Sequence, residues 1–346
     1  MFNTESVQPL LHPFTLGNLN LSNRTVMAPM TRNLSPNGVP GADVAAYYRR
    51  RAENNVGLIV TEGTVVDHAD ASNQENVPYF YGEEALNGWA NVVSEVHEAG
   101  GKIIPQIWHM GARGNVNDYS ESEISGIVDA FAQSAAEAKR IGFDGIEIHG
   151  AHGYLIDQFF WEKTNERTDR YGGSMIARTR FAEEVIQACR QAVGPDFTIV
   201  LRISQWKGTE YTAKLAKTPD ELQQFLQPLV NAGVDIFHCS TRRFWEPEFE
   251  GSDLNLAGWV KKLTGKPTIT VGSIGLDGDF MTLFTEGKGA ENASIERLVQ
   301  KLENQEFDLV AIGRALLVDP AWVSKIRDGK LDELIPFTPE ALKTLY

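Results

Sequence analysis

The sequence has only two cysteines, Cys189 and Cys239, among its 346 residues. Two thiols cannot build a disulfide framework, and they cannot supply the four ligands of an iron–sulfur cluster. The chain also lacks an apolar run that approaches the roughly 20 residues of a membrane span. Its N-terminus has no basic start followed by an apolar stretch, so we expect no signal peptide. These absences predict a cytoplasmic enzyme with no membrane partner.

Positive charge is also scarce, since the formal net charge is −14. Proteins that bind nucleic acids depend on lysine and arginine to neutralise phosphates, so no nucleic-acid partner is expected. A G-x-G-x-x-G turn after a first strand is missing as well. Gly287-Lys288-Gly289 comes closest, but it lacks the third glycine and follows no strand. An open, doubly wound dinucleotide-binding sheet is therefore disfavoured.

What the sequence does contain is an alternation of short apolar, β-branched segments with longer amphipathic segments, repeated eight times. Strands that are apolar on both faces and separated by helices form parallel sheets covered by helices. The pattern predicts an α/β fold, a closed (β/α)₈ barrel, in one domain spanning 1–346. The strands are expected at Thr25–Met30, Gly57–Glu62, Lys102–Trp108, Gly145–His149, Thr198–Ile203, Asp235–Cys239, Thr268–Val271 and Asp308–Ile312.

Helices are expected in the segments between these strands. The clearest amphipathic patterns are Ser122–Arg140, Arg178–Val193, Pro219–Ala232 and Ser294–Asn304. Before the first strand, Gly17-Asn18 separates two short apolar stretches. That arrangement is typical of a hairpin, which we expect to close the bottom of the barrel.

Chemistry in such a barrel takes place at the C-terminal ends of its strands. These ends are rich in uncharged donors, small residues and arginine, and Glu62 is the main carboxylate among them. The most informative end is that of the fourth strand, where His149, His152 and Tyr154 fall within six positions. Two imidazoles and a phenol in such proximity can bind a substrate oxygen and deliver a proton.

Glycines follow the last two strands, in Gly272-Ser273-Ile274-Gly275 and in Gly313-Arg314. Barrels of this kind commonly bind a phosphate at that place through backbone N–H groups. The guanidinium of Arg314 would add a permanently charged, bidentate partner. Three polar residues at other strand ends extend the outline of one long planar ligand, namely Thr31, Gln106 and Arg202.

These residues also permit other interpretations. Four histidines at strand ends permit a metal site, namely His109, His149, His152 and His238. The first strand, however, has no His-x-His pair and no bridging lysine or aspartate stands nearby, so no metal is predicted. A core residue with satisfied hydrogen bonds is an equal alternative for His238. A Schiff-base enzyme is disfavoured because no strand ends in a lysine, and Lys207 lies beyond the fifth strand.

Together these motifs resemble the Old Yellow Enzyme family of FMN-dependent NAD(P)H oxidoreductases and ene-reductases. The most specific motif is His-Gly-Ala-His-Gly-Tyr at 149–154, followed by Asp-Arg-Tyr-Gly-Gly-Ser at 169–174. The likeness covers nearly the whole chain. Its other segments are Leu11–Phe14, Asn23-Arg24, Ala28–Arg32, Thr61–Gly63, Gln106–His109, Leu201-Arg202, Gly313-Arg314 and Asp319-Pro320.

The resemblance implies one non-covalent FMN at the strand ends, with NADPH or NADH as the reductant. In this reading Thr31 would bond to the flavin near O4, Gln106 would reach the pyrimidine edge, and Arg202 would place positive charge near N1 and O2. Gly63 would let the chain approach the ring closely. The residues that would hold the cofactor are Pro29, Met30, Thr31, Gly63, Gln106 and Arg202 around the ring, and Gly272, Ser273, Gly313 and Arg314 around the phosphate.

The resemblance also implies the reduction of small activated alkenes. His149 and His152 would bind the carbonyl or nitro oxygen of the substrate, as an oxyanion hole does. Trp108 would form part of the substrate wall. Hydride from flavin N5 would reach the β-carbon, and Tyr154 would protonate the α-carbon from the other face. NAD(P)H and substrate would use one pocket in a ping-pong cycle.

One segment departs from the family. Ala112–Glu121 is short where most relatives carry a longer segment that helps to cover the active site.

A branch with an iron–sulfur cluster and a dinucleotide domain is disfavoured because the chain has too few cysteines. A non-redox barrel that binds a phosphorylated substrate and a flavin carrier without turnover are the alternatives. The sequence does not determine whether the chain forms a homo-oligomer, or whether it prefers NADH or NADPH.

Overall fold

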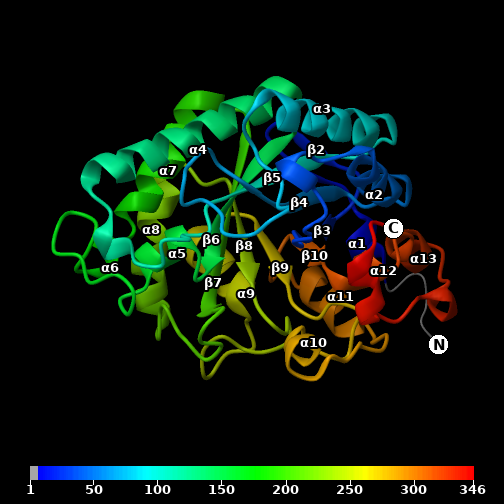
Figure 1. The fold of residues 1–346 in the computed structure, drawn as a ribbon. Helices are drawn as coiled ribbons and strands as arrows, with labels where there is room; N and C mark the ends of the chain where they lie inside the picture. Colours follow the sequence, from blue (N-terminus) through cyan, green and yellow to red (C-terminus); the bar gives the residue numbers. More distant parts are fainter. Residues whose placement is uncertain (1–6) are drawn as a thin grey trace.

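The computed structural model describes residues 7–346 and is a closed barrel of eight parallel strands wrapped by helices (Figure 1). This confirms the expected (β/α)₈ architecture. Residues 1–6, on which the expectation of no signal peptide partly rests, lie outside the described residues. Around the barrel the strands follow the order β10 (Leu309–Ile312), β3 (Thr25–Met27), β4 (Leu58–Val65), β5 (Ile103–Trp108), β6 (Gly145–His152), β7 (Thr198–Lys207), β8 (Ile236–Ser240) and β9 (Thr268–Val271).

The helices cover the outside of the barrel, and none of those in residues 7–346 is long and apolar enough to cross a membrane. The longest, α4, begins with a capping box between Ser120 and Glu123 and ends at Gly142, whose φ of 100° only glycine adopts readily. In chain order the helices are α1 (Gln8–Leu11), α2 (Ala42–Glu53), α3 (Glu83–Glu98), α4 (Glu121–Ile141), α5 (Leu155–Phe160), α6 (Met175–Arg178), α7 (Arg180–Val193), α8 (Pro219–Ala232), α9 (Leu256–Thr264), α10 (Met281–Glu286), α11 (Glu296–Glu303), α12 (Arg314–Val318) and α13 (Trp322–Arg327).

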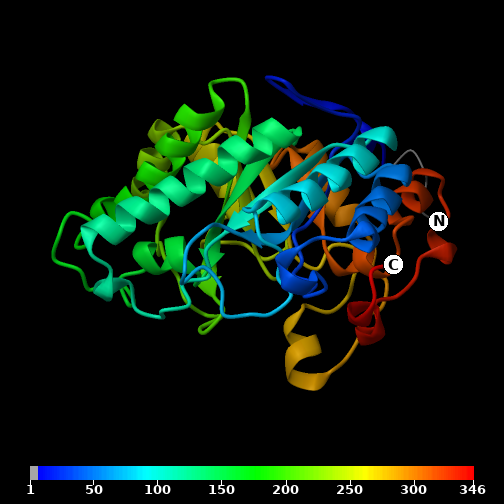
Figure 2. The ribbon, with the colours of Figure 1, turned by 45° about the horizontal axis from the view of Figure 1, so that its top comes forward.

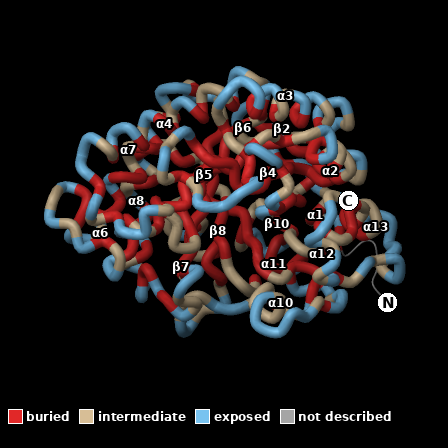
Figure 3. Tube along the Cα trace, viewed as in Figure 1, coloured by how far each residue is buried: buried red, intermediate tan, exposed pale blue. Residues whose placement is uncertain are grey.

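The apolar core has two parts. One lies between the strands and the helices, and the other fills the inside of the barrel. Figure 3 shows the buried strands at the centre of the molecule, with the exposed faces of the helices around them. Because successive side chains of a strand point to opposite faces, one strand supplies both cores.

A hairpin of β1 (Phe14–Leu16) and β2 (Leu19–Leu21) closes one end of the barrel, as the sequence predicts. Phe14, Leu19 and Leu21 join the interior core, where they pack with side chains from the strands. In Figure 2 the hairpin projects on the opposite side of the molecule from α10. The barrel interior is therefore filled with apolar side chains at its hairpin end.

A layer of polar residues lies between the apolar interior core and the C-terminal ends of the strands. Ile104, Val200 and Ile236 belong to the interior core. Two positions further along the same strands come Gln106, Arg202 and His238, which the alternation of a strand points to the same inner face. The fold thereby places a polar layer directly above an apolar one.

Several strand ends differ from the sequence-based expectation, and β4 and β8 end slightly later than expected, at Val65 and Ser240. β3 ends at Met27 and not at Met30, because Pro29 has no N–H to continue the ladder. β6 and β7 instead continue to His152 and Lys207, and their pairing contains an irregularity between Gly150 and His152. The short helix α10 was not predicted at all.

Candidate active site

A cavity of about 630 Å³ opens at the C-terminal ends of the strands. It collects nearly all the residues that the sequence analysis singled out, although they come from six different strands or the turns after them. The singled-out residues in its lining are Pro29, Met30, Thr31, Gln106, Trp108, His149, His152, Tyr154, Arg202, Gly272, Ser273, Gly313 and Arg314.

Gly63 is the exception, because it does not line the cavity. A Cβ atom built on Gly63 would lie 2.3 Å from Cε3 of Trp108. The missing side chain thus makes room for the indole of Trp108. The close approach of Gly63 to a flavin ring stays a prediction.

Buried hydrogen bonds hold the polar layer at the inner end of the cavity. The amide of Gln106 donates to one carboxylate oxygen of Glu147 at 2.9 Å, and Nδ1 of His238 lies 2.7 Å from the other. Burial lowers the pKa of His238, although the nearby carboxylate of Glu147 opposes this effect. Only Nδ1 of His238 is satisfied in this way, because its buried Nε2 has no hydrogen-bond partner among the described residues. Sequence reasoning missed Glu147, which lies inside its strand two positions before His149.

Arg202 is the cation of this inner end. Its side chain is buried, and its Nε has no hydrogen-bond partner among the described residues. Burial lowers the pKa of the guanidinium, while the carboxylate of Glu147 acts in the opposite direction. A buried donor without a protein partner is costly unless a ligand accepts from it.

His149 and Tyr154 pack edge to face in the wall of the cavity, with ring centroids 4.9 Å apart. The N–H of Ala151 donates to Nδ1 of His149 at 3.3 Å, and burial keeps the pKa of that imidazole well below its usual value. The ring is therefore neutral and carries its hydrogen on Nε2, where it can serve as a donor. Burial also raises the pKa of Tyr154, which keeps its phenol protonated.

His152 contributes differently from His149. Its Nε2 lies 2.7 Å from the hydroxyl of Ser240, and its ring stacks on Trp206 at 4.3 Å. The backbone of His152 has a φ of 64°, a left-handed conformation that costs free energy for a residue other than glycine. Its N–H donates to Oγ of Ser204 at 2.9 Å, which helps to hold this conformation.

The ends of β9 and β10 form a cradle of backbone donors. Within residues 7–346, the peptide N–H groups of Gly272, Ser273, Gly313 and Arg314 donate to no protein acceptor. Gly272 has a φ of 139°, and a Cβ atom there would lie 2.7 Å from the carbonyl oxygen of Thr241. Only glycine suits this turn. Unpartnered N–H groups at the ends of the last two strands are the donors that a phosphate requires.

Arg314 also lines the cavity, but its guanidinium is partly engaged elsewhere. It donates to the carbonyl oxygens of Gly278 at 2.5 Å and Asp279 at 3.3 Å. Arg314 therefore anchors the loop between β9 and α10, a role that the sequence did not suggest.

The rim of the cavity is built by segments outside the strands. Phe280, Leu283 and Phe284, in and just before α10, line it together with Leu342 near the C-terminus. No residue of α10 is buried, and Phe284 is 72 % exposed. The short segment Ala112–Glu121 contributes nothing to the lining. It packs instead against the loop after α5, where Arg167 donates to the carbonyl oxygen of Val116 at 2.7 Å.

The remaining histidine of the metal interpretation lies apart from this cavity. Nε2 of His109 lies 3.0 Å from Nδ1 of His68. Across the part of the chain that the structure describes, no group of three or more His, Cys, Asp or Glu side chains is arranged to hold a metal ion.

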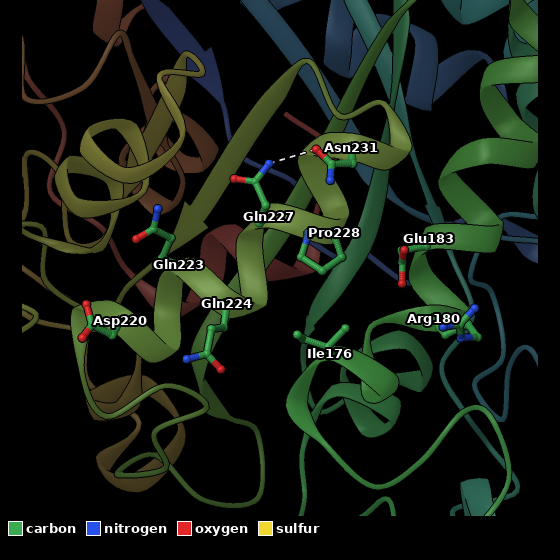
Figure 4. Close-up of a pocket in the computed structure, with 9 residues that line it drawn as sticks. All are labelled: Ile176, Arg180, Glu183, Asp220, Gln223, Gln224, Gln227, Pro228 and Asn231. Atoms are coloured by element: carbon green, nitrogen blue, oxygen red, sulfur yellow. Dashed lines mark hydrogen bonds between the residues drawn. The ribbon is translucent and has the colours of Figure 1, made fainter.

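A second cavity, of about 610 Å³, lies between α6, α7 and α8 on the outer surface (Figure 4). Its lining contains no histidine or tyrosine, and the hydrogen bond drawn there joins Gln227 to Asn231 on the same helix at 2.9 Å. The chemistry-bearing residues lie in the cavity at the strand ends.

The sequence matches the profile of the NADH:flavin oxidoreductase / NADH oxidase family over residues 9–121 and 114–333. It is 33 % identical over 351 residues to an NADH oxidase of Thermoanaerobacter brockii, covering 92 % of this chain and 50 % of that protein. The chain thus spans half the length of that relative. It is also 35 % identical to 12-oxophytodienoate reductase 2 of Arabidopsis thaliana, over 69 % of this chain and 72 % of the relative.

Among solved structures, the fold is similar to that of morphinone reductase in complex with tetrahydroNAD. The TM-score is 0.79 at 26 % sequence identity, and the match covers 96 % of this chain and 93 % of the other. The barrel architecture and nearly the full length of the chain are shared.

Proposed function

Because the chain belongs to the NADH:flavin oxidoreductase family, which includes the Old Yellow Enzymes, we propose that it is an ene-reductase. It uses NADPH or NADH to reduce activated C=C bonds of α,β-unsaturated carbonyl or nitro compounds. One observation carries the proposal: a single cavity contains proton donors, a cationic inner end and a cradle of unpartnered N–H groups. A phosphate-binding enzyme without a redox cofactor would need only the cradle.

FMN is the cofactor of this family, and the residues present fit it. The unpartnered Nε of the buried Arg202 and the free N–H groups after β9 and β10 lie in one cavity, so that a ring and a phosphate can be held together. When bound, FMN supplies hydride transfer between a nicotinamide and an alkene. Residues proposed to hold it are Pro29, Met30, Thr31, Gln106 and Arg202 at the ring, and Gly272, Ser273, Gly313 and Arg314 at the phosphate.

The inner end of the cavity favours negative charge on a ligand. Arg202 is positively charged, and Glu147 holds the amide of Gln106 in a fixed orientation by accepting its N–H at 2.9 Å. A fixed amide needs no reorganisation when a planar ligand accepts or donates there. These two residues therefore orient the ring edge that gathers charge on reduction.

His149 and His152 are proposed to bind the carbonyl or nitro oxygen of the substrate. The neutral ring of His149 has a donor on Nε2, and a donor in a dry site stabilises the negative charge that develops on that oxygen. Because Nε2 of His152 already contacts Ser240, we assign the larger part of this stabilisation to His149. Trp108 forms part of the substrate wall.

Tyr154 is proposed as the donor of the proton to the α-carbon. Its raised pKa keeps the hydroxyl protonated until a strongly basic, enolate-like carbon forms. The ring packs edge-on against Trp108 at 4.7 Å and against His149 at 4.9 Å, which fixes its direction in the cavity.

Reductant and alkene are proposed to use the same cavity in turn, in a ping-pong cycle. The hairpin end of the barrel is filled with apolar side chains, so the strand C-termini provide the entrance. The chain is proposed to act as one FMN-binding domain, 1–346, because one continuous barrel supplies all of these residues.

Absorbance and redox titration test the proposal. The purified protein should be yellow, release FMN and not FAD on denaturation, bleach with NAD(P)H in the absence of oxygen, and regain its colour with cyclohexenone. A protein that stays colourless after incubation with FMN would favour the non-redox alternative. A protein that binds FMN but is not reoxidised by any activated alkene would be a flavin carrier.

A further inference from the structure

Two adjacent arginines follow β8, and they differ in what they contact. Arg243 forms ion pairs with Glu246 at 2.9 Å and with the buried carboxylate of Asp279 at 2.8 Å. The guanidinium of Arg242 has no hydrogen bond and no ion pair within the described range, 7–346. The guanidinium lies over the ring of Tyr211, and Cζ of Arg242 is 5.7 Å from the ring centroid. Arg242 is partly exposed and lines the cavity.

A row of stacked rings leads from the proposed substrate site to Arg242. Trp206 stacks on His152 at 4.3 Å and 22°, and Tyr211 stacks on Trp206 at 5.6 Å and 25°. Phe280, just before α10, packs against Trp206 at 5.4 Å. All of these side chains line the cavity. Such a wall suits a ligand with flat aromatic parts, and Arg242 ends it with a positive charge.

The charge of the cavity lining is one-sided. No aspartate or glutamate belongs to the lining, which contains three arginines. Arg202 lies at the buried inner end, and Arg314 donates to the carbonyl oxygens of the β9–α10 loop. Arg242 is the arginine near the aromatic wall whose donors remain available.

On this basis we propose that Arg242, with Tyr211 and Trp206, forms a subsite for the phosphate-bearing part of the nicotinamide dinucleotide. The inference rests on the function proposed above and specifies how the reductant is recognised. NAD(P)H is a polyanion with planar groups at both ends, and the chain carries a net charge of −14 that repels it. A local cation beside the entrance offsets this repulsion and orients the ligand. Arginine binds phosphate oxygens through two parallel N–H bonds.

The test compares reductants with and without phosphate on FMN-saturated enzyme. Flavin bleaching is followed by anaerobic stopped flow with NADPH, NADH and N-benzyl dihydronicotinamide, which has no phosphate. Arg242→Ala should raise the apparent Kd for both dinucleotides by roughly 10- to 100-fold, because charge-assisted bonds are lost. The Kd for the benzyl compound should stay at its wild-type value. Increasing ionic strength should weaken NADPH binding in the wild type more than in this variant.

Arg243→Gln is the matched control, because it removes a neighbouring charge that is already paired. It should leave both classes of reductant bound as in the wild type. A second readout needs no turnover: the non-reducing analogue tetrahydroNADP is titrated against the visible spectrum of the bound flavin. Its affinity should fall in Arg242→Ala and be largely restored in Arg242→Lys.

Three outcomes would overturn the subsite. An equal rise in the Kd values of the benzyl compound and of NADPH would show that Arg242 shapes the nicotinamide site. A raised Kd for FMN with unchanged dinucleotide binding would show that it serves the phosphate of the cofactor. Unchanged tetrahydroNADP affinity would show that it contacts no part of the dinucleotide. Failure of the proposed function gives a different result: the wild-type enzyme would then bind the analogue, but NADPH and NADH would not reduce its flavin.

Discussion

Lys207 and Asp157 form an ion pair in which neither side chain has any solvent exposure. Nζ of Lys207 lies 2.6 Å and 2.8 Å from the two carboxylate oxygens. The same carboxylate accepts the N–H of Gly153 at 2.8 Å. The pair thereby fixes the end of β7 to the turn that carries His152 and Tyr154.

Breaking this pair should be costly for stability. Asp157→Asn leaves a buried ammonium without its counter-charge, and such a change typically lowers the free energy of unfolding by about 3–5 kcal/mol. Replacing both partners, with Asp157→Leu and Lys207→Met, should restore most of the stability, because apolar pairs of similar volume often substitute well. Urea unfolding of the FMN-bound proteins measures both. Alkene reduction should nevertheless stay low in the double variant, since Gly153 has lost its acceptor; full activity there would show that the pair does not position the turn.

Tyr154→Phe removes one hydroxyl and almost no volume. Flavin reduction by NAD(P)H should stay near the wild-type rate, while reoxidation by an enone should fall by about 10²–10⁴-fold. Nitroalkenes should be affected less, because the nitronate that forms can take its proton from water. Stopped-flow traces of the two half-reactions separate these effects. Undiminished enone turnover would mean that the ring of Tyr154 serves only for packing.

His149→Ala should also act on the oxidative half-reaction. The substrate oxygen loses the donor on Nε2, and the loss of one such donor typically costs about 10²–10³ in rate. A phenol, titrated against the long-wavelength charge-transfer band of the flavin, should bind weakly to this variant. Ser240→Ala, which removes the partner of His152 and not a substrate donor, serves as the comparison and should cost less. If phenol binding were unchanged in His149→Ala, His149 would not face the ligand.

Glu62 makes stability depend on pH. Burial raises the pKa of this carboxyl from 4.5 to about 7, and its Oε1 accepts the N–H of Arg32 at 3.2 Å. Between these two pH values the folded protein keeps a proton that the unfolded chain has released, so stability falls as pH rises through this window. Glu62→Gln should match the wild type below pH 4.5 and be more stable above pH 7, by of the order of 3 kcal/mol. Thermal unfolding across pH measures the difference; a constant difference at all pH values would contradict this cause.

The sequence predicted the barrel and most of the cavity because both follow from local patterns. Gln106 and Arg202 lie near the ends of the strands that the sequence predicts, where the alternation of inner and outer side chains continues from the apolar core. Glu147 was missed because it lies within a strand, two positions below the conspicuous His149. Asp157 and Lys207 are 50 positions apart, and no local pattern relates them.

Other details depend on how side chains share space. The contact between Gly63 and Trp108 was not predicted, because it depends on how the indole fills the volume that the glycine leaves. The second role of Arg314 depends on the path of the loop at Gly278 and Asp279. The helix α10 was missed because it is short and buries no residue, so it has no apolar face to reveal its period.

The construction of the rim bears on how this protein can change in evolution. Phe280, Leu283 and Phe284 line the cavity from α10 and the residue before it, a helix with no buried residue, and Leu342 does so from near the end of the chain. Substitutions there leave the folding of the barrel and the proton donors untouched. Single substitutions at these positions are therefore expected to change the ligand preference of the cavity without first passing through unstable intermediates.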